Sequence, residues 1–138
     1  MKSLVYMKYL KLFEDFSNKY LCHGTSLENA KSIIEYGFSE DVYMGDEYTA
    51  KSYAYSYDTP VLIKIPLNEV EPFLEVNTTL LNHYEMMRDE ESDDEAIEVL
   101  EAWESSKKTW RDSLNIFGSV ILQPNNVNIT DDNIISLY

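Results

Sequence analysis

His23 is the residue around which a binding or reactive site is most readily built in this sequence. It ends an apolar run over residues 20–23 and is followed by Gly24, Thr25 and Ser26. Histidine gains or loses a proton near neutral pH, and free backbone amides at the start of a helix attract an anionic or carbonyl group. We therefore expect this stretch to hold a small polar ligand beside the helix that follows it.

A block of tyrosines forms the second candidate element of a site: Tyr43, Tyr48, Tyr53, Tyr55 and Tyr57. Each buried phenol needs a hydrogen-bond partner, so this many tyrosines exceed what a core requires. Electron-rich ring faces also hold a flat cationic ring well. We expect Tyr43 to face a ligand, and Tyr48 and Tyr57 to pack or lie at the surface, because helical spacing places them away from Tyr53.

Local signals predict the elements that position these residues. A strand is expected over 20–23, followed by a helix. A capping box of Thr25 and Glu28 should begin this helix, and Gly37 should end it. Asp46 or Thr49 can cap a second helix over residues 48–57. Further strands are expected over residues 42–44, 61–65, 70–76, 114–117, 120–122, 127–129 and 134–137.

Helical periodicity predicts further helices in two other parts of the chain. Apolar residues at three- and four-residue steps predict a helix over 3–18, and two more within 78–105 that are interrupted at 91–94. With the strands, these helices predict a single α+β domain over residues 1–138. Its sheet is expected to be split and mostly antiparallel, with flanking helices and an acidic helical insertion over 78–105.

The formal net charge of −14 is concentrated in residues 85–104, where ten acidic residues accompany one basic residue, Arg88. Such a field repels a phosphate backbone, so we do not expect nucleic acid as a partner. It would favour a basic surface on a partner protein. The alternative interpretation is a solvated helix face that aids solubility.

Other classes of protein are excluded by composition. The single cysteine, Cys22, excludes an internal disulfide, and one thiol beside one histidine gives no metal site. The N-terminal residues lack a continuous apolar core, so we expect neither a signal peptide nor a membrane span. These features favour a soluble protein in the cytoplasm of a producing or host cell, and they leave the oligomeric state open.

The order of these elements resembles a known family. Five segments follow one another along the chain: Leu21-Cys22-His23-Gly24-Thr25-Ser26, a helix ending at Gly37-Phe38, Val42-Tyr43-Met44, Ala50-Lys51-Ser52-Tyr53-Ala54 and a strand over 61–65. This succession resembles the diphtheria-toxin-like branch of the ADP-ribosyltransferases, which includes the poly(ADP-ribose) polymerases. The resemblance covers residues 20–65 well and the later strands only loosely, and it implies that fold with NAD as the substrate.

Carried over residue by residue, the resemblance implies an NAD pocket. His23 would hydrogen-bond the adenine-side ribose, the backbone of Gly24 would pair with the nicotinamide carboxamide, and Ser52 would add a contact to that carboxamide. Tyr43 and either Tyr53 or Tyr55 would sandwich the nicotinamide ring. The implied cofactor-binding residues are His23, Gly24, Thr25, Tyr43, Ser52 and Tyr53, with Tyr53 preferred to Tyr55 because it precedes Ala54.

The family's usual glutamate at the start of a late strand is missing. Such a carboxylate polarises a ribose hydroxyl and stabilises the oxocarbenium-like transition state, but the matching position holds Gly118 or Ser119. Three interpretations stay open: another acid such as Asp112 or Glu47 replaces it, transfer proceeds without it, or the domain is inactive. The candidate catalytic residues are His23, Tyr43 and Asp112.

Two functions follow from this pattern. The first is a mono-ADP-ribosyltransferase of the phage or bacterial effector type, a glycosyltransferase that cleaves NAD and modifies a protein. The second is a catalytically inactive, acidic binding protein on the same fold, which occupies a basic surface of its partner. An RNA 2'-phosphotransferase would use the same type of fold and NAD, but it needs basic residues around the pocket, and this sequence has too few.

Overall fold

A six-stranded sheet organises the part of the chain that the computed structural model describes, residues 20–124 and 126–138. All pairings between its strands are antiparallel, and the strand order is β4-β5-β2-β1-β3-β6. The strands are β1 (Tyr20–Ser26), β2 (Val42–Gly45), β3 (Pro60–Pro66), β4 (Leu74–Val76), β5 (Ser119–Leu122) and β6 (Ile134–Ser136). The prediction of an α+β fold is confirmed, whereas the predicted helix over 3–18 lies outside the described residues.

The sheet opens between its two central strands. β1 pairs with β3 along its whole length, from Tyr20 opposite Pro66 to Ser26 opposite Pro60. It pairs with β2 only where Cys22 lies opposite Gly45. Two three-stranded halves, β4-β5-β2 and β1-β3-β6, therefore meet at a single residue pair and diverge beyond it.

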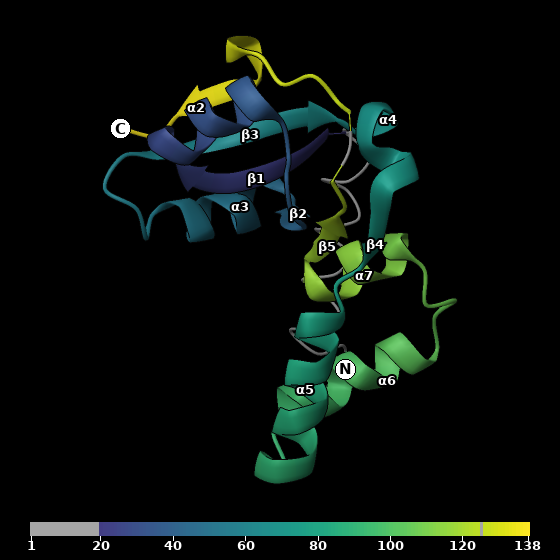
Figure 1. Ribbon diagram of the computed structural model, residues 1–138. Coiled ribbons are helices and arrows are strands. Elements are labelled where there is room, and N and C mark those ends of the chain that lie inside the picture. Colours follow the sequence, from purple (N-terminus) through teal and green to yellow (C-terminus); the bar gives the residue numbers. More distant parts are fainter. Residues whose placement is uncertain (1–19, 125) are drawn as a thin grey trace.

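Helices α2 (Leu27–Tyr36) and α3 (Glu47–Ala54) cover opposite faces of β1 and β3 (Figure 1). Alternate residues of a strand point to opposite faces. On one face Ile63 packs in the main core with Ala30 of α2. On the other face Leu62 packs with Ala50 and Ala54 of α3.

Capping side chains fix where these two helices begin. Ser26 caps α2, with its hydroxyl accepting from the Asn29 amide, so the predicted capping box of Thr25 and Glu28 is wrong. The strand continues three residues further than expected, because residues 24–26 still pair with β3. Of the two candidates for the cap of α3, Asp46 is the one that caps it, accepting from the Thr49 amide at 2.7 Å.

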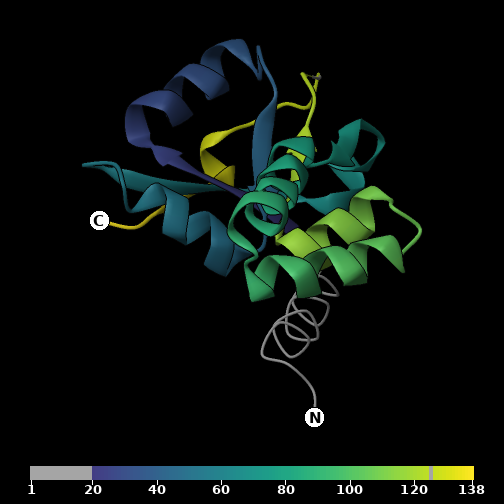
Figure 2. The ribbon, with the colours of Figure 1, turned by 90° about the horizontal axis from the view of Figure 1, so that it is seen from below.

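The acidic segment forms two helices, α5 (Thr78–Glu91) and α6 (Asp94–Glu104), as predicted. Ser92 in a left-handed conformation ends α5, and Asp93 caps α6. We call α5 and α6 the acidic hairpin. It projects from the sheet (Figure 1), and from below it lies against α7 (Trp110–Phe117) (Figure 2). In the described ranges, no helix is long and apolar enough to cross a membrane.

Three predicted strands are absent or altered. Residues 114–117 belong to helix α7, which a capping box of Thr109 and Asp112 begins and Gly118, at φ 76°, ends. Residues 70–76 are mostly helical turns, α4 (Leu67–Val70) and a 3₁₀ turn Glu71–Phe73, because Pro72 lies at the start of that turn. Residues 127–129 form no strand, and a second 3₁₀ turn, Asp131–Asn133, precedes β6.

Candidate functional site

A cavity of about 140 Å³ lies where the two halves of the sheet diverge. Its walls come from β1, β2, α3 with the turn that follows it, and the first residue of β5. In another protein, an enclosed apolar cavity of about 150 Å³ holds one benzene molecule. The size of this cavity therefore suits a single aromatic ring.

His23 bridges the gap between β1 and β2. Its Nδ1 atom lies 2.7 Å from the carbonyl oxygen of Tyr43. Burial lowers the pKa of His23, and the hydrogen bond to Tyr43 only partly opposes that effect. The ring is therefore neutral at neutral pH, and since a carbonyl oxygen only accepts, Nδ1 carries the proton. Nε2 is left as a hydrogen-bond acceptor with no partner among the described residues.

Gly24 lets α3 lie directly against β1. A Cβ atom at this position would come within 1.9 Å of the Ala50 carbonyl oxygen and 2.9 Å of the Ala54 nitrogen. No side chain fits there, so glycine is required by packing. For the same reason, only backbone atoms of Gly24 line the cavity.

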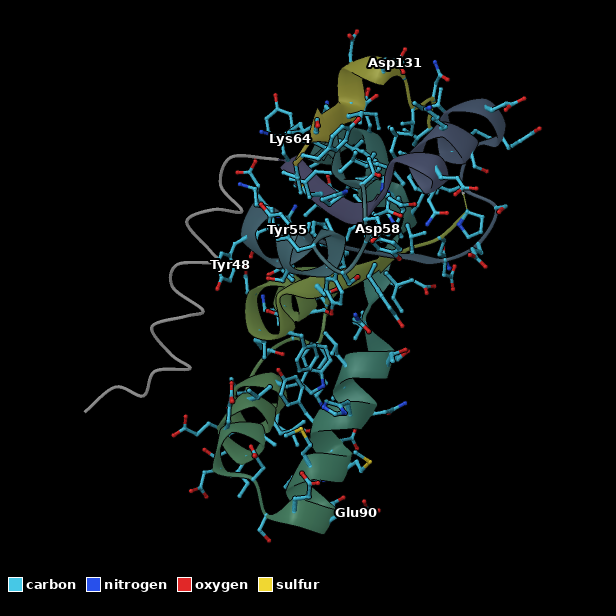
Figure 3. The ribbon with its side chains drawn as sticks, turned by 90° about the vertical axis from the view of Figure 1, so that its left-hand side faces the viewer. Tyr48, Tyr55, Asp58, Lys64, Glu90 and Asp131 are labelled. Atoms are coloured by element: carbon cyan, nitrogen blue, oxygen red, sulfur yellow. The ribbon has the colours of Figure 1, made fainter. Side chains whose placement is uncertain are left out.

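Three half-exposed tyrosines form the aromatic part of the lining. Tyr43 comes from β2, and Tyr53 comes from the face of α3 that also presents Thr49 one turn earlier. Tyr57 lines the cavity as well, contrary to our expectation, because the turn after Ala54 continues the helical direction. Tyr48 and Tyr55 lie on the outer surface of this segment and outside the lining (Figure 3).

Three of the predicted site residues do not line the cavity. Thr25 is buried and accepts a hydrogen bond from the Asn29 side chain. Ser52 donates its hydroxyl proton to the carbonyl oxygen of Tyr48. Asp112 accepts from the amide and hydroxyl of Thr109 at the start of α7. Each of these polar groups therefore has a local structural partner away from the cavity.

Ser119, the first residue of β5, also lines the cavity. Its hydroxyl accepts from the side-chain amide of Asn77 at 3.0 Å. Ser113 donates to the Ser119 carbonyl oxygen at 2.7 Å. Sequence reasoning missed Asn77 because it lies 42 residues from Ser119 along the chain. It missed Ser113 because no local pattern connects that residue to the cavity.

Cys22 lines the cavity but is not a nucleophile. Burial, with a smaller contribution from Glu47, raises the pKa of its thiol to about 11. The thiol therefore stays protonated at neutral pH, and the thiolate is the nucleophilic form. Cys22 packs with Ala50 and Leu62 as a small apolar side chain. Elsewhere in residues 20–124 and 126–138, no three potential metal-binding side chains come together.

No protein-family model, curated protein or solved structure matches this chain. What the cavity can do therefore follows from its own residues. Among the described residues, its lining holds a neutral histidine, hydroxyl groups and aromatic rings, and no carboxylate. Such a surface suits an aromatic ring with polar substituents, neutral or carrying a delocalised positive charge.

Proposed function

We propose that this protein binds NAD with the nicotinamide ring in the cavity and transfers ADP-ribose to a protein. The observation that carries the proposal is the ring-sized cavity whose lining includes Tyr43, Tyr53 and His23. The resemblance of residues 20–65 to ADP-ribosyltransferases supports the same assignment. The split antiparallel sheet is consistent with it.

The cavity offers the contacts that a nicotinamide ring needs. The oxidised ring is flat and positively charged, and tyrosine faces attract such a ring. Tyr43 and Tyr53 belong to different elements, so they can lie on two sides of it. Gly24 lines the cavity with backbone atoms, and these supply amide or carbonyl groups for the carboxamide.

His23 then has a defined role toward the sugar. With Nδ1 donating to Tyr43, Nε2 accepts a hydrogen bond from a ribose hydroxyl. Because the ring is neutral, it adds no positive charge beside the cationic nicotinamide. His23 therefore orients the substrate and leaves the chemical step to other groups.

In the transfer step, the bond between the anomeric carbon and the nicotinamide nitrogen breaks. A nucleophile on the target protein forms the new bond to that carbon, and its proton passes to solvent. The described lining has no carboxylate to stabilise the positive charge that develops on the sugar. Of the two acids considered, Asp112 is engaged in a helix cap and Glu47 is exposed at the start of α3. We therefore expect slow transfer.

The proposal is tested with labelled NAD in a cell lysate. The wild-type chain, His23→Ala, Tyr43→Ala and Tyr55→Ala are compared, the last because Tyr55 lies outside the lining. We expect labelled protein bands with the wild type and Tyr55→Ala and none with the other two. NAD should also raise the melting temperature of the wild type. Full labelling by His23→Ala and Tyr43→Ala would show that the cavity is not the NAD site.

A second candidate function is an inactive acidic binding protein that occupies a basic surface. The acidic hairpin carries eight exposed carboxylates, of which Asp89 pairs with Arg88 and Glu104 with Lys108. Figure 3 places Glu90 at the tip of this hairpin, far from Asp131 at the other end of the molecule. No labelling, together with no effect of NAD on the melting temperature, would favour this function over transfer.

A further inference from the structure

The hydroxyl proton of Ser119 makes only one long hydrogen bond within the described chain. Ser119 is 1% exposed, and its Oγ atom accepts from the Asn77 side chain. Within the described chain, the acceptor recorded for the Ser119 hydroxyl proton is the carbonyl oxygen of Val120 at 3.5 Å. That distance exceeds the usual O–H···O range by about 0.5 Å. A buried donor without a good acceptor is costly, and this one lines a cavity.

Asn77 fixes the direction of the bond to Ser119. Its Oδ1 atom accepts from the Leu80 amide at 3.1 Å and caps α5. An amide nitrogen cannot accept in place of that oxygen, so Nδ2 must face Ser119 and donate. The hydroxyl of Ser113, which accepts from the Asn77 backbone amide and donates to the Ser119 carbonyl oxygen, holds both residues in place.

A second serine in the lining provides the comparison. Ser56 also lines the cavity, but its hydroxyl donates to the carbonyl oxygen of Tyr53 at 2.8 Å. Its proton is therefore already used. Of these two serines, only Ser119 has a hydroxyl proton available to a bound molecule.

We infer that Ser119 donates its hydroxyl proton to a ribose oxygen of the bound nucleotide and that Asn77 is the positioning residue that directs it. The inference rests on the proposed function and adds a specificity contact to it. His23 offers an acceptor and Ser119 a donor, and a ribose diol presents both complementary groups. An ionised carboxylate could only accept a hydrogen bond, whereas the Ser119 hydroxyl donates one.

The first test measures dissociation constants for NAD, ADP-ribose and nicotinamide by calorimetry, using the full chain. Loss of one neutral hydrogen bond weakens binding about threefold to tenfold. We expect that loss for NAD and ADP-ribose with Ser119→Ala. We expect no change with Ser105→Ala, because Ser105 is exposed at the end of α6 and lies outside the cavity lining. Nicotinamide, which has no ribose, should bind both variants like the wild type. Weaker nicotinamide binding by Ser119→Ala would identify the carboxamide as the acceptor and overturn the ribose assignment.

The second test reverses the hydrogen bond through Asn77→Asp. Aspartate keeps an oxygen to cap α5 but replaces Nδ2 with an acceptor, which takes the Ser119 proton. NAD should bind this variant about as weakly as it binds Ser119→Ala. Adding Asn77→Asp to Ser119→Ala should weaken binding no further, whereas a merely structural effect of residue 77 would add to the first loss.

The outcomes separate the two proposals. If the wild type binds neither NAD nor ADP-ribose, the proposed function fails. If the wild type binds NAD and Ser119→Ala binds it equally well, only the role of Ser119 fails. Should Asn77→Asp not fold, the comparison of Ser119→Ala with Ser105→Ala decides the matter alone.

Discussion

The cavity wall and the acidic hairpin are held together by opposite kinds of packing. At the cavity, α3 touches β1 through residues with little or no side chain, Gly24, Ala50 and Ala54. The hairpin instead joins α7 through large rings, with Phe117 between Tyr84 and Trp103. The cavity should therefore be damaged most by added atoms, and the hairpin by removed atoms.

The largest effect is expected for Phe117→Ala. The Phe117 ring is 6% exposed, stacks on Tyr84 at 5.6 Å and lies tilted against Trp103 at 5.0 Å between centroids. Truncating a buried phenylalanine costs about 3–5 kcal/mol because it leaves a cavity. Denaturant unfolding should show this loss in the free energy of unfolding. A loss below about 1 kcal/mol would mean that the hairpin is not held by this cluster.

The opposite change, an added methyl group, is tested by Gly24→Ala. The new Cβ atom would meet the Ala50 carbonyl oxygen, and backbone cannot move aside as a flexible side chain can. Overpacking of this kind costs about 1–3 kcal/mol, and displacement of α3 should also abolish NAD binding. Calorimetric melting and ligand titration measure the two effects.

Gly37→Ala is the matched control for that substitution. Nothing lies within 4 Å of a Cβ atom at Gly37, but the backbone φ of +78° disfavours alanine. With ψ at −174°, this backbone conformation is one that essentially only glycine adopts, so the substitution should cost about 1–3 kcal/mol. It should leave NAD binding unchanged. If Gly37→Ala impaired binding as much as Gly24→Ala, the effect at Gly24 would reflect general instability instead of contact with α3.

The same contrast explains what the sequence could predict. The hairpin helices follow from local periodicity, and the cap at Asp46 follows from a single residue type. His23, Gly24, Tyr43 and Tyr53 gather in one cavity because they lie within a short stretch whose element order was predictable. The apolar run 114–117 was assigned to a strand because it is short, although Thr109 and Asp112 mark the start of a helix.

The contacts that sequence reasoning missed are long-range ones. Asn77 and Ser119 are separated by 42 residues, and neither has a local signal beyond that of a polar residue near a helix or strand end. Their pairing depends on how β4, α7 and β5 pack together. Such a contact is decided by the tertiary fold, so periodicity and capping rules cannot reveal it.

The smallest effect is the pH dependence contributed by His23. Burial lowers the pKa of His23 below its ordinary value of 6.5, so the unfolded chain takes up a proton on this ring before the folded chain does. The contribution of His23 to the free energy of unfolding is therefore complete above pH 6.5. It is lost as the pH falls from there through the lowered pKa of the folded state. His23→Gln removes this titration.

The measurement is the free energy of unfolding of the wild type minus that of His23→Gln, from about pH 7.5 to about pH 5. The carboxylates of the acidic hairpin are present in both proteins, so the difference isolates the cavity histidine from the charged region. This difference should become less favourable to the wild type as the pH falls. A difference that does not change with pH would mean that His23 is protonated as easily in the folded state as in the unfolded state. The assignment of Nε2 as a neutral acceptor facing the ribose would then be wrong.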